Sequence, residues 1–117
     1  MNIGIIGLGV VGKACRTGFE RCGYTVSIHD IAMHTDINVV LDTEICYICV
    51  PTPSNNNGGC DTNIVDSVVE QLININYEGI IAIKSTISPG HTKLLNDRYL
   101  TDRIVFVPEF LKERSAE

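Results

Sequence analysis

Three glycines near the start of the chain have the spacing of a phosphate-binding turn. Gly7, Gly9 and Gly12 follow the apolar run NIGII and precede a segment with helical periodicity. In such a turn the first glycine permits the tight bend, the second lets the main chain approach a pyrophosphate, and the third lets the helix pack closely on the strand. Val10 and Val11 open the helix, where unpaired N–H groups and the positive end of the helix dipole attract anions. The turn therefore predicts a pyrophosphate site.

An acidic residue follows the second apolar run at the distance expected of a ribose-binding carboxylate. Asp30 lies 18 residues after Gly12, at the end of the apolar run YTVSIH. A carboxylate there accepts hydrogen bonds from the adenine-ribose diol and repels a 2′-phosphate. Strand, turn, helix and acid together predict binding of NAD rather than NADP. The alternative is a glycine turn selected for packing, with an unrelated acid at the start of a loop.

Apolar runs alternate with amphipathic segments along the whole chain. Because continuous apolar strands separated by helices form parallel sheets that are buried on both faces, the pattern predicts an α/β fold. Right-handed crossovers then give one Rossmann-like, doubly wound domain over residues 1–117, with about five strands in the order 2-1-3-4-5. The predicted strands are Asn2–Gly7, Tyr24–His29, Ile45–Val50, Gly79–Lys84 and Arg103–Val107, and the predicted helices are Val10–Cys22, Thr62–Ile75 and a segment from Ser88-Pro89, read as its cap and first turn, to about Leu100.

Two local features complete these predictions. Asp61 or Thr62 is a plausible cap for the second helix, whose apolar face is predicted to hold Ile64, Val65, Val68, Val69, Leu72 and Ile73. The segment Ile37–Leu41 is compatible with a short strand, a turn of helix or a linker.

The carboxyl ends of the other strands carry further candidate residues, since ligands bind at that edge of an open parallel sheet. Pro51 and Thr52 follow the third strand, and Ser85 and Thr86 follow the fourth. Their hydroxyls suit contacts with a cofactor or substrate, although turn chemistry and helix capping explain them equally well. Glu109 comes directly after the fifth strand and is a candidate general acid or base, with an exposed carboxylate as the alternative.

The composition narrows the class of protein. The chain has 117 residues and a formal charge of −5, with 14 acidic and 9 basic residues. An acidic chain without basic clusters is a poor candidate for binding nucleic acid or anionic membranes, and no apolar run reaches the roughly 18–20 residues of a membrane span. Five cysteines without a secreted-scaffold pattern, and an N-terminus without the features of a signal peptide, favour a reducing cytoplasm.

The cysteines and histidines are predicted to have structural or surface roles. Cys15 and Cys22 are expected on the inward face of the first helix, and Cys46 and Cys49 on opposite faces of a strand, where Cys49 could flank a ligand. Cys60 is expected in an exposed loop. The histidines are scattered, so we expect no metal site and predict surface positions for His29, His34 and His91.

Four blocks of sequence carry a resemblance to a known family. IGLGVVG, CVPTP, KSTISPG and TDRIVFVPEFLKE occur in this order and cover most of the chain. Together they resemble the N-terminal, NAD-binding domain of the UDP-glucose/GDP-mannose dehydrogenases, above all the members that oxidise UDP-glucose. This family oxidises the C6 alcohol of a nucleotide sugar to a carboxylate with two NAD molecules.

The resemblance implies roles for individual residues. It assigns the glycine turn, Asp30, Pro51 and Ser85 to NAD, and places Thr52 and Thr86 beside the cofactor or the reacting centre. Glu109 matches the glutamate that transfers protons and activates water. Phe110, Leu111 and Lys112 match a segment that lines the sugar, and Glu113 matches a glutamate near the nicotinamide.

The departures from the family matter equally. The chain ends at Glu117, before the regions in which the resemblance places the nucleophilic cysteine and catalytic lysine. We therefore expect no complete four-electron oxidation from the isolated chain, and its status as an enzyme stays open. It is then a fragment, half of a split enzyme with a partner chain or second copy, or a non-catalytic nucleotide-binding or interaction module.

Two further observations qualify the resemblance. The segment between Asp30 and Ile45 is shorter than in the family. The basic residue that commonly follows the ribose-binding acid in the family is missing, because IAMHT follows Asp30, so NAD affinity is expected to be weak. A hydroxyacid dehydrogenase of the 6-phosphogluconate type would share the glycine turn, but would not explain the PEFLKE and CVPTP blocks.

Overall fold

A five-stranded parallel sheet forms the centre of the protein. The computed structural model describes residues 1–30, 35–52, 62–88 and 90–107. Every strand pairs in parallel with its neighbours, in the order β2-β1-β3-β4-β5, which confirms the predicted doubly wound sheet. The strands are β1 (Asn2–Ile6), β2 (Thr25–His29), β3 (Ile45–Ile48), β4 (Ile80–Ile83) and β5 (Ile104–Phe106).

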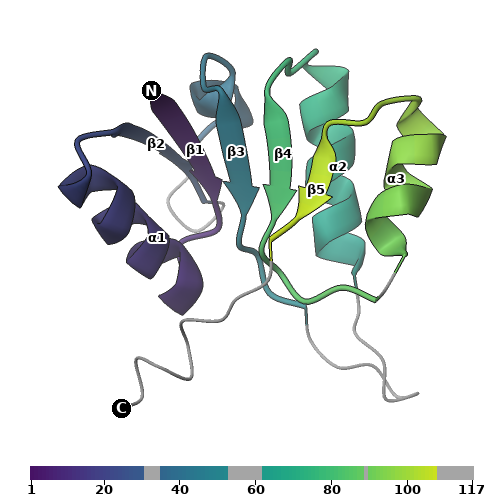
Figure 1. Ribbon diagram of the computed structural model, residues 1–117, viewed down its shortest axis with the longest axis horizontal. Helices are drawn as coiled ribbons and strands as arrows, with labels where there is room; N and C mark the ends of the chain where they lie inside the picture. Colours follow the sequence, from purple (N-terminus) through teal and green to yellow (C-terminus); the bar gives the residue numbers. More distant parts are fainter. Residues whose placement is uncertain (31–34, 53–61, 89, 108–117) are drawn as a thin grey trace.

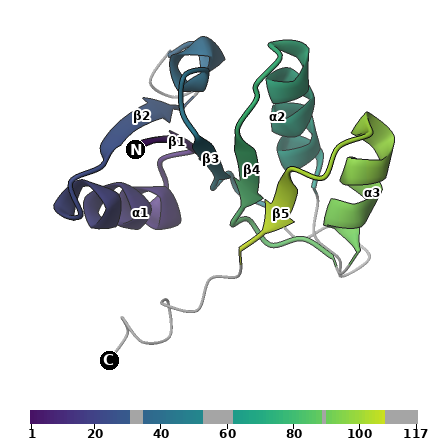
Figure 2. The same ribbon diagram turned by 45° about the horizontal axis from the view of Figure 1, so that its top comes forward.

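Helices cover both faces of this sheet (Figures 1 and 2). The helix α1 (Val10–Arg21) lies on one face, while α2 (Asn63–Asn74) and α3 (His91–Tyr99) lie on the other. Adjacent residues of β3 show the division, because successive side chains of a strand point to opposite faces. The ring of Tyr47 packs against Phe19 of α1, with ring centroids 5.0 Å apart, whereas Ile48 belongs to the core beneath α2.

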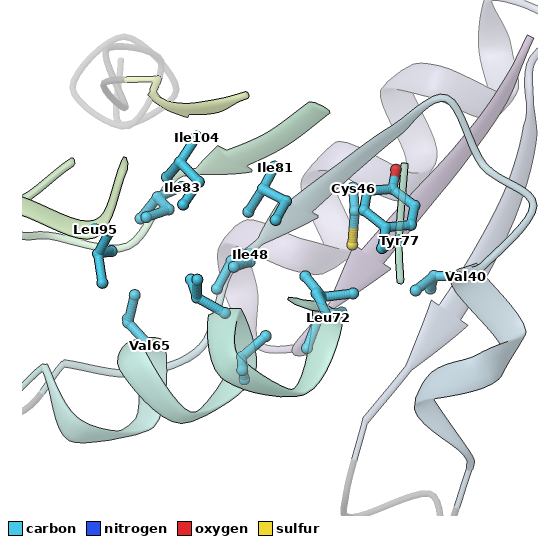
Figure 3. Packing of buried hydrophobic residues seen from close by; sticks show 13 residues of the cluster. Val40, Cys46, Ile48, Val65, Leu72, Tyr77, Ile81, Ile83, Leu95 and Ile104 are labelled. Carbon is cyan, nitrogen blue, oxygen red and sulfur yellow. The ribbon is translucent and has the colours of Figure 1, made fainter. Parts of the chain in front are cut away.

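The main hydrophobic core lies between the sheet and the helices α2 and α3 (Figure 3). Strand residues of one parity meet the apolar stripe of α2, and Leu95 is the one buried residue of α3. Burial of each large aliphatic side chain stabilises the fold by roughly 1.5–3 kcal/mol. The fully buried members of this core include Cys46, Ile48, Val65, Val69, Leu72, Ile81, Ile83 and Leu95.

A short 3₁₀ helix, η2 (Ile37–Val40), makes the crossover from β2 to β3. Of the three predicted alternatives for Ile37–Leu41, a short strand, a turn of helix or a linker, the structure has the turn of helix. Asp36 caps η2 by accepting a hydrogen bond from the backbone N–H of Asn38 at 2.9 Å, and this bond lowers the pKa of Asp36. Val40 is fully buried against Gly4, where an added Cβ would lie 2.9 Å from the Val40 Cβ.

The helix ends differ in detail from the predictions. The N-cap of α3 is Gly90 rather than Ser88, because the chain enters the helix through a left-handed residue at φ 85°, a conformation that glycine adopts without steric cost. Ser88 instead contributes its carbonyl oxygen, which accepts a hydrogen bond from the His91 N–H at 3.1 Å. Thr62 is the N-cap residue of α2, as one of the two predicted alternatives had it.

Three predictions about burial were wrong. Cys22 is exposed because α1 ends at Arg21 and Cys22 is its C-cap. His29 is buried at the end of β2, and its Nδ1 lies 2.8 Å from the Thr35 hydroxyl oxygen. Ile64 of α2 is exposed because it faces away from the core, in which its neighbour Val65 is fully buried. Among the residues that the structure describes, no helix is long and apolar enough to cross a membrane.

Candidate functional site

The glycine turn connects β1 to α1 in a conformation that needs glycine at two positions. Gly7 has φ 95°, and an added Cβ would lie 2.9 Å from the backbone carbonyl carbon of Cys49. A Cβ on Gly12 would overlap the carbonyl oxygen of Gly7, so Gly12 is what permits α1 to pack against the turn. Gly9 differs, because nothing lies within 4 Å of the position of its Cβ. Gly9 therefore borders open space.

The helix α1 begins at this open space without a capping side chain. Gly9 is its N-cap residue and makes no side-chain hydrogen bond to the first turn. The first amides of a helix have no partner inside the helix, so they bind anions or water when no side chain caps them. An anion next to Gly9 would meet these N–H groups and the positive end of the helix dipole.

Asp30 is held beside the same turn. Its Oδ2 accepts a hydrogen bond from the backbone N–H of Leu8 at 2.6 Å, and its own N–H donates to the Thr35 hydroxyl at 2.8 Å. An ionised carboxylate can accept about four hydrogen bonds. The contact with Leu8 therefore fixes the position of the carboxylate and is compatible with further acceptance from a diol.

A pocket of about 730 Å³ lies at the carboxyl ends of the strands. It lies next to the neighbouring strands β1 and β3, whose following helices, α1 and α2, lie on opposite faces of the sheet (Figure 2). This is the topological switch point at which open α/β sheets bind ligands, and the volume is in the range of small-molecule sites. Most of the described candidate residues line it. They are Gly7, Gly9, Val10, Val11, Asp30, Pro51, Thr52, Ser85 and Thr86, whereas Gly12 lies behind the turn.

Sequence reasoning missed part of the pocket wall. Ile64, Val68 and Gln71 of α2 line the pocket, and their spacing places them on one stripe of the helix. The sequence predicts Ile64 and Val68 on the apolar face of the helix and does not single out Gln71. Only the position of α2 relative to the glycine turn shows that these three residues border a cavity. Lys84 and His29 also line the pocket. Lys84 lies inside the KSTISPG block, so its position there was a signal that could have identified it.

Ser85 and Thr86 occupy the β4 side of the pocket in different ways. The Ser85 hydroxyl donates to the carbonyl oxygen of Val50 at 2.6 Å, and the Ser85 N–H donates to that of Ile48 at 3.2 Å. Ser85 therefore joins the ends of β3 and β4. Thr86 is exposed and lines the pocket.

The thiols near the pocket are protonated rather than activated. Cys49 lies just beyond β3 and lines the pocket, and a hydrogen bond with the Cys15 thiol together with burial raises the pKa of Cys49. Burial raises the pKa of Cys46 to about 12. A protonated thiol is a poor nucleophile. In the described part of the chain, no group of three or more His, Cys, Asp or Glu residues could hold a metal ion.

The remaining candidates lie outside the described residues. These are Glu109, Phe110, Leu111, Lys112 and Glu113, together with Cys60 and His34. Their roles stay as the sequence predicts them.

The fold and the pocket define a class of protein, the Rossmann-type nucleotide-binding domains. The chain belongs to the UDP-glucose/GDP-mannose dehydrogenase family, whose NAD binding domain matches residues 29–117. The match starts at the end of β2, so the glycine turn is identified by its sequence and geometry instead.

Individual relatives agree with this assignment. UDP-glucose 6-dehydrogenase of Streptococcus pneumoniae is 37% identical over 76 residues, which are 62% of this chain and 19% of that protein. The UDP-glucose 6-dehydrogenase of Campylobacter jejuni is 41% identical over 56 residues, 48% of this chain and 14% of that protein. The chain thus spans at most 19% of the length of these curated relatives.

Solved structures share the fold. A UDP-glucose dehydrogenase from Pyrobaculum islandicum superposes with a TM-score of 0.76 at 21% identity, covering 93% of this chain and 36% of that one. GDP-mannose dehydrogenase from Pseudomonas aeruginosa superposes with a TM-score of 0.73 at 24% identity, covering 94% and 36%. The domain described by residues 1–107 therefore has the architecture found in nucleotide-sugar dehydrogenases.

Proposed function

We propose that residues 1–117 form an NAD-binding domain and that the pocket at the switch point holds the dinucleotide. The observation that carries the proposal is the convergence on one cavity of the glycine turn, the uncapped start of α1 and the Asp30 carboxylate. Each of these features suits one part of the same ligand, because amides bind a pyrophosphate and a carboxylate binds a ribose diol. The matched family domain supports this choice of ligand.

The strand order supports one orientation of the proposed dinucleotide along the edge of the sheet. Asp30 follows β2 at one side of the pocket, and Thr86 follows β4 three strands away. Neighbouring strands lie about 4.8 Å apart, so the two residues are separated by roughly 14 Å along the edge of the sheet. With the adenine ribose at Asp30 and the pyrophosphate at Gly9, the nicotinamide end would extend toward Thr52, Ser85 and Thr86.

The proposed chemistry of the complete protein is oxidation of the C6 alcohol of a nucleotide sugar such as UDP-glucose. Bound NAD would supply the hydride acceptor. Thr86 would contact the reacting centre, and Glu109 would handle protons, while Phe110, Leu111 and Lys112 would contact the sugar and Glu113 the nicotinamide. The support for these roles is the family resemblance of the two blocks that contain them.

Calorimetric titration of the 117-residue chain with NAD and NADP tests the cofactor assignment. We expect NAD to bind and NADP to bind more weakly. In Gly9→Ala the new Cβ enters open space in the free protein but would crowd the pyrophosphate, so NAD affinity should fall about tenfold while folding is retained.

Gly18→Ala is the matched control, because nothing lies within 4 Å of that position either and Gly18 lies in α1 away from the pocket. It should bind NAD as the parent does. Absence of NAD binding by the parent, or equal affinity in Gly9→Ala, would contradict the proposal.

A non-catalytic nucleotide-binding module is the second candidate, favoured by the raised pKa values of Cys46 and Cys49, which leave these thiols protonated. The 117-residue chain alone is expected to give no complete oxidation in either case, so NADH formation with UDP-glucose separates the two only in the complete protein or after mixing with a partner chain. A partner chain or second copy would be required if activity appears only on mixing.

We also propose a reducing compartment such as the cytoplasm, in keeping with the free thiols of Cys15, Cys22, Cys46 and Cys49.

A further inference from the structure

One polar contact joins the two helices on the core side of the sheet at the end nearest the pocket. The His91 Nε2 lies 2.7 Å from the Asp66 Oδ1, with 15% and 28% of the two side chains exposed. A carboxylate only accepts hydrogen bonds, so the imidazole Nε2–H is the donor. His91 is the first residue of α3, and Asp66 lies in the first turn of α2.

We propose that His91 is a positioning residue for the pocket, which it shapes by fixing the segment of residues 84–88 against α2. This inference rests on the proposed function, since it concerns how the NAD pocket keeps its form. Lys84, Ser85 and Thr86 at the start of that segment line the pocket, and so does α2 through Ile64 and Val68. The bond between His91 and Asp66 therefore ties together two walls of one cavity.

The two ends of the segment are anchored by different contacts. At its start, the Ser85 hydroxyl donates to the Val50 carbonyl at 2.6 Å. At its end, the His91 N–H donates to the Ser88 carbonyl, and the His91 side chain binds Asp66. The exposed Thr86 lies between these anchors, next to Ile87, which packs against the core.

Helix α3 is also attached to the rest of the fold through its second half. It is nine residues long, and Leu95 is its one buried residue. Asn96 binds both the N–H and the carbonyl of Ile104, which attaches the second half of α3 to β5. Within the described residues, these contacts attach the second half of the helix to β5. His91 attaches its first turn to α2 and, through the Ser88 carbonyl, to residues 84–88.

Asp66 is itself positioned to accept the bond. Its N–H donates to the Thr62 carbonyl at 2.8 Å, and its Oδ2 accepts from the Thr62 hydroxyl at 3.3 Å. The carboxylate thus lies at the start of α2, where the helix dipole favours negative charge. His91 contacts an oxygen whose position is already fixed.

Hydrogen exchange of the amides of residues 84–88 tests positioning without any ligand. His91→Phe removes the donor and should raise exchange about tenfold, the size expected for one charge-assisted hydrogen bond. His91→Gln keeps a donor near Nε2 and should stay within about threefold of the parent. Asp66→Ala should resemble His91→Phe, and the double variant should be no worse than either. Asp97→Ala, which removes an exposed acid from α3, is the control.

NAD titration of the same variants links positioning to binding. We expect His91→Phe and Asp66→Ala to weaken NAD binding several-fold, with recovery in His91→Gln. Unchanged exchange and unchanged affinity in His91→Phe would overturn the inference. If the parent does not bind NAD, the proposed function fails, while the exchange data still decide whether His91 fixes the segment. If His91→Phe does not fold, Asp66→Ala supplies the test in its place, and parent-like exchange and NAD affinity in that variant would overturn the inference.

Discussion

The carboxylate of Asp30 accepts a hydrogen bond from the backbone N–H of Leu8 at 2.6 Å, which connects the end of β2 to the glycine turn after β1. Two neighbouring strand ends are thereby fixed relative to one another. The residue proposed to bind the ribose is thus also a residue that orders the proposed pyrophosphate turn. A structural role and the proposed ligand-binding role thus fall on one side chain.

Replacing Asp30 should therefore affect both stability and cofactor binding. In Asp30→Ala the Leu8 N–H loses its partner, so we expect the free energy of unfolding to fall by about 1–2 kcal/mol and NAD affinity to fall at least tenfold. Asp42→Ala, which removes the same charge at an exposed position, should change neither. Urea unfolding and calorimetry measure the two effects. Parent-like NAD affinity in Asp30→Ala would rule out the ribose assignment.

The same glycine-to-alanine change should have opposite effects at two positions of α1. In Gly12→Ala the Cβ would overlap the Gly7 carbonyl oxygen, so α1 must move and unfolding should become easier by about 2 kcal/mol or more. In Gly18→Ala the Cβ meets open space in an exposed turn of helix, and stability should rise by about 0.5–1 kcal/mol. Denaturant unfolding compares them, and a stabilising Gly12→Ala would contradict this account of the turn.

Tyr77 should make stability depend on pH in the alkaline range. Its side chain is 1% exposed and its hydroxyl lies 3.0 Å from the Thr43 Oγ1. Burial raises the pKa of Tyr77 to about 12. The unfolded chain loses this proton near pH 10 while the folded chain keeps it, so stability should fall by about 2 kcal/mol as pH rises from 10 to 12.

Tyr77→Phe supplies the comparison, because phenylalanine has no proton to lose. Its stability at neutral pH should be lower by about 1 kcal/mol through loss of the bond to Thr43. Its further loss of stability above pH 10 should be smaller than that of the parent. Identical alkaline curves for both proteins would show that Tyr77 titrates alike in the folded and unfolded states.

The cysteines should differ sharply in their reactivity with iodoacetamide. Cys22 is exposed at the end of α1, whereas Cys46 is buried with a pKa raised to about 12. At pH 8 only about one Cys46 thiol in ten thousand would be ionised even if the reagent could reach it. Mass spectrometry should find Cys22 alkylated early and Cys46 unmodified in the native protein, with both modified in urea. Rapid alkylation of native Cys46 would mean that the core opens readily.

Asn96 should stabilise β5 at the edge of the sheet. Its amide donates to the Ile104 carbonyl at 2.9 Å and its oxygen accepts from the Ile104 N–H at 3.1 Å, so it replaces a missing strand partner of β5. Asn96→Ala should destabilise the protein by about 1–2 kcal/mol, and Asn96→Asp, which loses the donor, by an intermediate amount. Parent-like unfolding of Asn96→Ala would show that β5 needs no such support.

The strands, the helices and their order follow from the sequence because they depend on local periodicity and a chiral rule. Short, β-branched apolar runs such as GIIAIK favour buried strands, and right-handed crossovers leave few arrangements of five alternating strands. The glycine turn and Asp30 are similarly local signals, since the bend at Gly7 and the close packing at Gly12 require glycine, and distance along the chain places the acid. The predicted and observed strand orders therefore agree.

The surroundings of single side chains were decided by the tertiary structure. Periodicity places Ile64 on the apolar stripe of α2, but in the folded protein this residue is exposed and lines the pocket. Helical spacing places Cys22 inside, but α1 ends one residue earlier. His29 and His91 are held by Thr35 and Asp66, which lie on other segments of the chain. These contacts join residues on different segments of the chain, six positions apart for His29 and 25 for His91. They depend on how those segments pack, which no repeating sequence pattern encodes.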